Sequence, residues 1–93
     1  MNRTDIINTI ARKIEAKSYL EIGVDNGVNF NKVECVYKVG VDPYPQMIGI
    51  LPMTSDEFFS KNSEKFDLIF IDGLHLSDQV SRDIDNALNV LNT

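Results

Sequence analysis

The sequence has few of the residues that build disulfide frameworks or zinc clusters. Cys35 is the only cysteine among 93 residues, and there is no tryptophan. One cysteine excludes an intrachain disulfide and a cysteine-based zinc cluster, and it fits a reducing cytosol. No apolar run approaches the length of a membrane span, and residues 1–17 lack the continuous apolar stretch of a signal peptide. We therefore expect a cytoplasmic protein with no membrane partner.

Positive charge is also scarce. Nine Lys and Arg residues stand against 14 Asp and Glu, which gives a formal net charge of -5. Phosphate binding needs clustered cations, and these are scattered, so we expect no nucleic-acid partner. An acidic surface tolerates a cationic small ligand better. With 43% hydrophobic and 25% charged residues, residues 1–93 are expected to form one small globular domain.

Apolar residues at helical spacing predict amphipathic helices at residues 4–17 and 77–91, each with one buried stripe. A brief helix is expected at 26–32. A Thr-x-x-Glu capping box at Thr54 predicts a further helix. The two stripes comprise Ile6, Ile7, Ile10 and Ile14 in the first helix, and Val80, Ile84, Leu88 and Leu91 in the last.

Short apolar runs predict strands at residues 18–23, 36–41 and 66–71, with a weaker strand at 48–53. Because these strands alternate with helices, right-handed crossovers are expected between them. The sequence therefore predicts an α/β fold, with a parallel sheet covered by helices on both faces.

In an open parallel sheet, ligands bind outside the carboxyl ends of the strands. Gly23 and Gly27 follow the first expected strand, where the backbone must bend sharply and let a ligand approach. Residues 18–31 contain no Lys or Arg, whereas they contain two carboxylates, those of Glu21 and Asp25. These carboxylates disfavour the pyrophosphate of a dinucleotide such as NAD and favour a ligand with an ammonium and a sulfonium group.

Asp42 follows the second expected strand and lies 21 residues after Glu21. From this position one carboxylate can accept hydrogen bonds from both hydroxyls of a ribose. The alternative is that Asp42, which precedes Pro43, only caps a turn. Tyr44 has two interpretations as well, since it can lie against an adenine or simply cover the end of the sheet.

Three motifs occur in order, from Tyr19 to Gly27, from Val39 to Pro43 and from Phe66 to His75. Together they resemble class I S-adenosylmethionine-dependent methyltransferases, and most closely the small family-24 type, over roughly residues 15–92. The resemblance implies S-adenosylmethionine as cofactor. It also implies a three-layer Rossmann-like fold with strand order 3-2-1-4, in which the C-terminal strands of the full methyltransferase fold are lacking.

The resemblance implies cofactor-binding roles for several residues. Glu21, Gly23 and Gly27 are expected to cradle the methionine moiety, whereas Asp42 binds the ribose. Asp25 takes the place of the middle glycine of the commoner motif. At the position of the adenine contacts this chain has Thr54 and Ser55, although Thr54 fits a helix cap equally well.

For catalysis the resemblance points to Asp72 and His75. His75 has a suitable intrinsic pKa for accepting a proton near neutral pH, but a lone histidine in a loop is often merely solvated. One aspartate does not make a site for a hard divalent cation, so we expect no metal site.

Two functional hypotheses remain open, and the three ordered motifs favour the first. The first is methyl transfer to an oxygen or nitrogen of a small-molecule acceptor. The second is a non-catalytic nucleoside-binding or self-associating module. Without a fifth strand, residues 66–72 form an open apolar edge, and we expect a homodimer or higher homo-oligomer to cover it.

Overall fold

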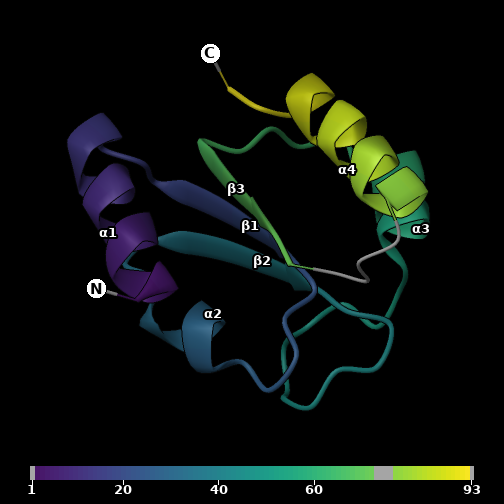
Figure 1. Cartoon of the computed structure of the whole chain (residues 1–93), viewed down its shortest axis with the longest axis horizontal. Coiled ribbons are helices and arrows are strands. Elements are labelled where there is room, and N and C mark those ends of the chain that lie inside the picture. Colours follow the sequence, from purple (N-terminus) through teal and green to yellow (C-terminus); the bar gives the residue numbers. More distant parts are fainter. Residues whose placement is uncertain (1, 73–76, 93) are drawn as a thin grey trace.

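The computed structural model describes residues 2–72 and 77–92. Its centre is a three-stranded parallel sheet in the order β2-β1-β3 (Figure 1). The strands are β1 (Ser18–Ile22), β2 (Tyr37–Val41) and β3 (Leu68–Ile71). All three carboxyl ends therefore meet at one edge of the sheet, as a ligand site of this fold class requires.

Helices cover both faces of the sheet. The helices are α1 (Arg3–Ile14), α2 (Val28–Lys32), α3 (Ser55–Lys61) and α4 (Ser77–Asn89). Figure 1 shows α1 and α2 on one side of the strands, with α3 and α4 on the other. This three-layer arrangement confirms the predicted α/β class. Within the described residues, no helix has both the length and the apolar character needed to cross a bilayer.

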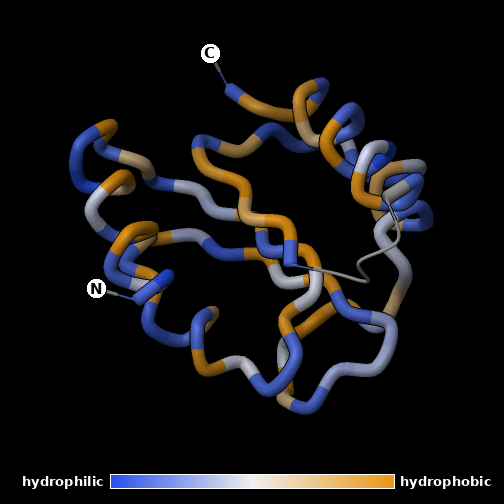
Figure 2. The backbone as a smooth tube through the Cα atoms, viewed as in Figure 1, coloured by the Kyte–Doolittle hydropathy of each residue, from blue (hydrophilic) through white to orange (hydrophobic). Residues whose placement is uncertain are grey.

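The core is divided by the central strand β1, whose side chains alternate between the two faces. Tyr19 is fully buried on the face covered by α1 and α2, where it packs with Phe30. Leu20 is fully buried on the opposite face, in a cluster with Phe58 and Phe66. Hydrophobic residues run along the whole of β3 (Figure 2). Both clusters draw on β3, so a short strand serves two layers.

The strand expected at residues 48–53 is reduced to a single parallel bridge between Val41 and Leu51. The Leu51 amide donates to the Gly40 carbonyl at 2.9 Å, and its carbonyl accepts from the Asp42 amide at 3.1 Å. Pairing cannot extend, because Gly49 has a left-handed φ of 92° and Pro52 has no amide hydrogen. The strand order 3-2-1-4 is therefore not confirmed, although Leu51 lies beside β2.

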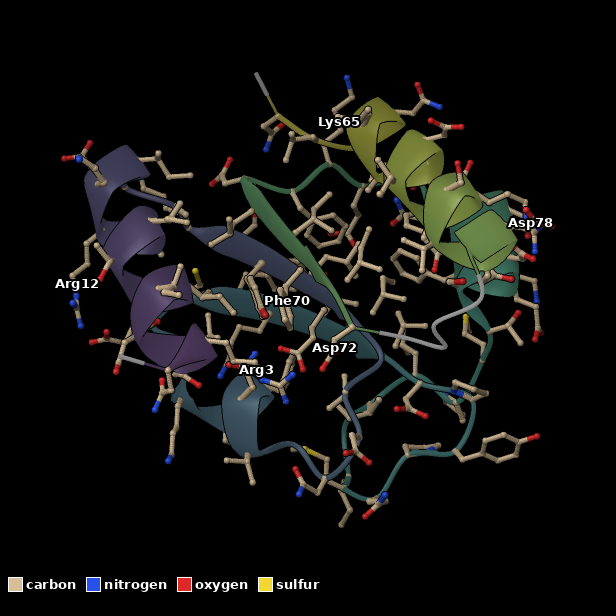
Figure 3. All side chains as sticks on the ribbon, in the orientation of Figure 1. Arg3, Arg12, Lys65, Phe70, Asp72 and Asp78 are labelled. Carbon is tan, nitrogen blue, oxygen red and sulfur yellow. The ribbon has the colours of Figure 1, made fainter. Side chains whose placement is uncertain are left out.

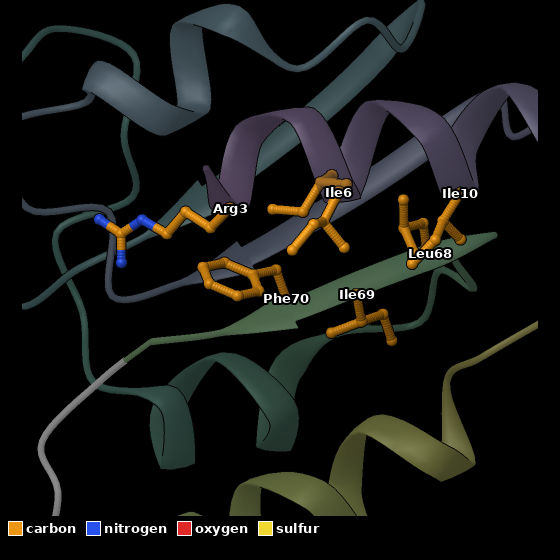
Figure 4. A pocket seen from close by; sticks show the side chains of 7 residues that line it. Arg3, Ile6, Ile10, Leu68, Ile69 and Phe70 are labelled. Carbon is orange, nitrogen blue, oxygen red and sulfur yellow. The ribbon is translucent and has the colours of Figure 1, made fainter. Parts of the chain in front are cut away.

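The stripe predicted for the first helix is only partly buried. Ile7 is buried, but Ile6, Ile10 and Ile14 are 43–53% exposed. Ile6 and Ile10 lie on the side of α1 next to β3, which is the last strand of the described sheet. An apolar groove of about 260 Å³ runs between α1 and β3. Figure 4 shows Ile6, Ile10, Leu68 and Phe70 along it.

The stripe predicted for the last helix is wrong. Ile84 and Leu88 are 47% and 63% exposed, whereas Asp83 and Ala87 on another face of α4 are buried. The face with Asp83 and Ala87 points inward because the Asp83 carboxylate is hydrogen-bonded to α3. Ser55 Oγ donates this hydrogen bond at 2.6 Å. Leu91 lies beyond α4 and forms a bridge with Phe66.

Candidate functional site

A cleft of about 510 Å³ opens at the carboxyl ends of the strands. Five of the residues predicted for the site line it, and these are Gly23, Asp42, Thr54, Ser55 and Asp72. Hydrophobic side chains from the strand ends, such as Ile22 and Val41, form part of its wall. Polar groups thus converge on an apolar pocket, which is the usual composition of a small-ligand site.

The turn between β1 and α2 has an unusual backbone. Gly23 and Gly27 have φ angles of 86° and 83°, and Asp25 between them has 57°. Residues other than glycine seldom adopt this left-handed region, but Asp25 does. The Gly23 amide donates to the Val41 carbonyl at 2.8 Å. The turn is therefore joined to β2, and it brings Gly23 and Asp25 to the cleft.

Gly27, at the end of this turn, is not among the residues that line the cleft. It precedes α2 as its N-cap residue. A Cβ atom at this position would lie only 2.1 Å from the sulfur of Met47. Glycine is therefore required at position 27, because the backbone is left-handed there and the loop that follows β2 packs closely against it.

Asp42 bridges the two loops at the cleft. Its Oδ2 accepts a hydrogen bond from the backbone amide of Asp25 at 2.8 Å, and its Oδ1 accepts one from the amide of Tyr44 at 2.8 Å. A carboxylate has about four acceptor positions, so each oxygen retains one. The predicted turn cap and the predicted ligand position are therefore compatible in the same side chain.

Glu21 is buried beneath the turn, at 1% exposure, and is not part of the cleft lining. Its Oε1 accepts hydrogen bonds from Tyr19 Oη at 2.6 Å and from Asn29 Nδ2 at 2.8 Å. Thr4 Oγ1 in turn donates to Asn29 Oδ1 at 2.6 Å. This network joins α1, β1 and α2, so it supports the turn from below.

Burial changes the acid–base properties of this network. Desolvation raises the pKa of Glu21, and the hydrogen bonds from Tyr19 and Asn29 oppose that rise. Desolvation and the contact with Glu21 also raise the pKa of Tyr19. Tyr19 thus remains a neutral hydrogen-bond donor to Glu21 at physiological pH.

Thr54 is the N-cap of α3, as the capping box predicts. Its hydroxyl accepts a hydrogen bond from the Glu57 amide at 3.1 Å, and the Thr54 amide donates to Glu57 Oε1 at 3.3 Å. Ser55 follows at the first position of α3, and its hydroxyl contacts α4. The sequence-based interpretation of Thr54 as a helix cap is confirmed.

Gln79 and Asp83 line the cleft and were not predicted as site residues. Gln79 Nε2 donates to Ser55 Oγ at 3.1 Å and to Asp83 Oδ1 at 2.9 Å. The sequence contains one weak signal for this pair, namely two polar residues four positions apart on one face of a helix. The apolar stripe with Ile84 and Leu88 is a stronger signal on the same helix, but these two residues are exposed.

Asp72 follows β3 and forms an ion pair with Arg3 of α1. The Asp72 amide donates to the Ile22 carbonyl at 2.7 Å, which places the residue beside the turn after β1. The Arg3 guanidinium also lies 5.8 Å from the centre of the Phe70 ring. Figure 3 shows these three side chains together near the end of β3. Arg3 thus neutralises one carboxylate of the cleft.

His75 lies outside the described residues. Tyr44 lines the cleft with 85% of its surface exposed, which is compatible with both of its sequence-based interpretations. Within residues 2–72 and 77–92, no three His, Cys, Asp or Glu side chains are grouped to hold a metal ion.

Comparison with known families assigns the chain. The model of methyltransferase domain family 24 matches residues 36–93, which is more than half of the sequence. The match contains Asp42, Thr54, Ser55 and Asp72, while the turn after β1 precedes it. Among curated proteins, none matches the sequence. The chain therefore belongs to family 24 of the methyltransferase domains, as its three ordered motifs predict.

Proposed function

We propose that the cleft binds S-adenosylmethionine and that the protein transfers the methyl group to an oxygen or nitrogen of a small-molecule acceptor. The observation that carries this proposal is the geometry of Asp42. Its carboxylate lies at the end of β2, faces the cleft and is held by one backbone amide on each oxygen. The remaining acceptor position on each oxygen suits the two adjacent hydroxyls of a ribose.

The size and chemistry of the cleft fit this ligand. Its volume of about 510 Å³ is within the range of roughly 300–1,000 Å³ that is typical of small-ligand pockets. Apolar side chains at the strand ends can cover an adenine ring. The carboxylates of Asp25 and Asp42 suit a ligand that carries positive charge.

When bound, S-adenosylmethionine would supply a methyl group on a positively charged sulfur. The acceptor's oxygen or nitrogen would bond to the methyl carbon as the carbon–sulfur bond breaks, and S-adenosylhomocysteine would leave. The protein's task is then chiefly to hold donor and acceptor in line. Gly23 lets the backbone approach the ligand, Asp42 fixes the ribose, and Glu21 acts from below by supporting the turn. Ser55 presents its hydroxyl near the expected adenine position, held there by Asp83.

An acceptor that loses a proton needs a base near the methyl group. Asp72 lines the cleft, but its carboxylate already contacts Arg3, which cannot itself accept a proton. We therefore assign Asp72 to positioning and retain His75, the sequence-based candidate, as the proton acceptor. Substitution of His75 by Gln should lower turnover but leave cofactor binding unchanged.

Calorimetric titration with S-adenosylmethionine and S-adenosylhomocysteine tests the proposal. We expect binding to the native protein and a loss of about ten- to one-hundredfold in affinity for Asp42→Ala, since a charged hydrogen-bond acceptor is removed. Asp85→Ala is the matched control, because Asp85 is exposed and lies outside the cleft. Absence of heat and of a thermal shift with both ligands would refute the proposal.

A second candidate is a self-associating module, and the exposed apolar stripe of α1 favours it. Ile6 and Ile10 line the groove beside β3, whose outer side is an edge of the described sheet (Figure 4). We propose that the groove is covered by a second copy of the chain, since an open apolar strand edge can pair with its symmetry mate.

A further inference from the structure

The first turn of α1 contacts two segments that lead into the cleft. Arg3 forms an ion pair with Asp72, which lines the cleft after β3. The next residue, Thr4, donates from Oγ1 to Asn29 Oδ1 at 2.6 Å, and Asn29 Nδ2 donates to Glu21 Oε1 at 2.8 Å. Two consecutive residues of one helix therefore reach both the end of β3 and the buried support of the turn after β1.

The guanidinium of Arg3 is held in place by a second contact. It lies 5.8 Å from the centre of the Phe70 ring, within the range of a cation–π interaction (Figure 4). An exposed ion pair is usually weak, because its side chains must be ordered to form it. The Phe70 ring already restricts Arg3, so less ordering remains. Arg12 of the same helix provides a contrast, since it pairs with Glu34 and lies over no aromatic ring among the described residues.

Asp72 connects this restraint to the strand ends. Its backbone amide donates to the Ile22 carbonyl at 2.7 Å, and Ile22 and Gly23 line the cleft together with Asp72. Among the described residues, Arg3 is the only cation that forms an ion pair with Asp72. Loss of Arg3 would therefore release a side chain of the cleft whose backbone is joined to the strand that leads into the turn after β1.

We propose that Arg3 is a positioning residue of the cleft, which fixes Asp72 at the end of β3 while Thr4 fixes the support of the turn after β1. This inference rests on the proposed function, because the affinity that it concerns is that of the cleft for its ligand. Arg3 does not itself line the cleft, so it acts through Asp72. A ligand then meets segments that are already ordered, which lowers the cost of binding.

Hydrogen exchange in the ligand-free protein tests the restraint on Asp72. We expect Arg3→Met to speed exchange at the Asp72 amide by about two- to fivefold, since the end of β3 loses its tie to α1. Arg3→Lys keeps the positive charge and should restore most of the protection. Arg12→Met is the matched control, because it breaks the ion pair with Glu34 on the same helix. Equal exchange at Asp72 in Arg3→Met and Arg12→Met would refute the restraint.

Calorimetric titration with S-adenosylhomocysteine, paired with urea unfolding, separates positioning from stability. We expect Arg3→Met to lower the affinity by about two- to fivefold, and Arg3→Lys to recover most of it. In an Asp72→Ala background the Arg3→Met substitution should have no further effect, because Arg3 acts through Asp72. Arg12→Met should bind like the native protein. A merely structural ion pair would change the free energy of unfolding and leave the affinity unchanged.

The outcomes distinguish this inference from the proposed function. If the native protein does not bind S-adenosylhomocysteine or S-adenosylmethionine, the proposed function fails and the effect of Arg3 on affinity fails with it, while hydrogen exchange still decides the restraint on Asp72. If the native protein binds but Arg3→Met binds equally well, cofactor binding stands and the positioning role is refuted. An effect of Arg3→Met that persists without the Asp72 carboxylate would also refute it.

Discussion

The backbone amide of Asp25 donates a hydrogen bond of 2.8 Å to Oδ2 of Asp42, and this bond joins the loops that follow β1 and β2. The other oxygen of Asp42 holds the amide of Tyr44 at 2.8 Å. One carboxylate therefore organises both sides of the cleft before any ligand arrives. Such preorganisation lowers the cost of binding, because neither loop must be ordered by the ligand.

Asp42→Ala should release both loops in the ligand-free protein. We expect faster hydrogen exchange at the amides of Asp25 and Tyr44, since each loses its acceptor. Exchange of β1 amides should be unaffected, as the sheet ladder does not involve Asp42 side-chain atoms. Unchanged exchange at both loop amides would contradict the bridging role.

Gly27→Ala should destabilise the fold more than Gly49→Ala. Both glycines have left-handed φ angles, of 83° and 92°, so each substitution carries a backbone cost of roughly 1–2 kcal/mol. A Cβ at Gly27 also meets the Met47 sulfur at 2.1 Å, whereas one at Gly49 has nothing within 4 Å. We expect about 1–3 kcal/mol of additional destabilisation at Gly27, measured by urea unfolding.

The same comparison in a Met47→Ala background isolates the steric cost. Removal of the Met47 sulfur should bring the two glycine substitutions to nearly equal effects. A gap that persists without Met47 would show that another contact causes it.

Asp83→Ala should destabilise the protein by about 2–4 kcal/mol, because it leaves the Ser55 hydroxyl and the Gln79 amide without their buried acceptor. Asp85→Ala, on the exposed side of the same helix, should stay within about 0.5 kcal/mol of the native protein. Chemical denaturation of the two variants makes the comparison. Equal effects would mean that burial of Asp83 adds no stability.

Glu21→Gln should flatten the pH dependence of stability. Burial raises the pKa of Glu21 above its ordinary value of 4.5, so the native state binds more protons than the unfolded state between the two values. The stability that Glu21 contributes is complete below its ordinary pKa. It is lost as pH rises through the raised pKa of the folded protein. We expect the stability of the native protein, relative to Glu21→Gln, to fall as pH rises from 4.5.

Asp67 provides a control of opposite sign. Hydrogen bonds from the Lys17 amide and the Asn92 side chain lower the pKa of Asp67. Its contribution is present above the ordinary pKa and is lost as pH falls through the lowered one. Asp67→Asn should therefore alter the acidic limb of a thermal-shift profile and leave the Glu21 limb in place. A native profile without the limb assigned to Glu21 would contradict the raised pKa.

Ile10→Glu should prevent self-association. Ile10 lines the groove between α1 and β3 and is 43% exposed, so a charge there opposes burial against a second copy. Light scattering at micromolar concentration should give a dimeric mass for the native protein and a monomeric mass for the variant. Val36→Glu is the control, since Val36 is 94% exposed and lies outside the groove. A monomeric native protein would contradict the interface.

The sequence by itself determined the features that depend on neighbouring residues. The capping box at Thr54 requires only Glu57 three positions later, and the structure contains it. The apolar run ending at Asp72 is enough to specify a strand, and the structure has β3 there with side chains that are half-buried on both faces. The order of the three motifs indicated the methyltransferase family, and it placed Gly23 and Asp42 at strand ends that do meet at the cleft.

Tertiary structure alone decided which way each face points. Helical spacing marks a stripe but not what lies opposite it, so the exposure of Ile84 and the burial of Asp83 followed only from the contact between α4 and α3. Pairing beside β2 ended at Leu51 because the adjoining backbone turns away. Glu21 was predicted at the ligand, yet the alternation of β1 directs its side chain beneath the turn, toward Tyr19 and Asn29. Spacing along a chain fixes which residues share a face, whereas only packing between elements determines what that face meets.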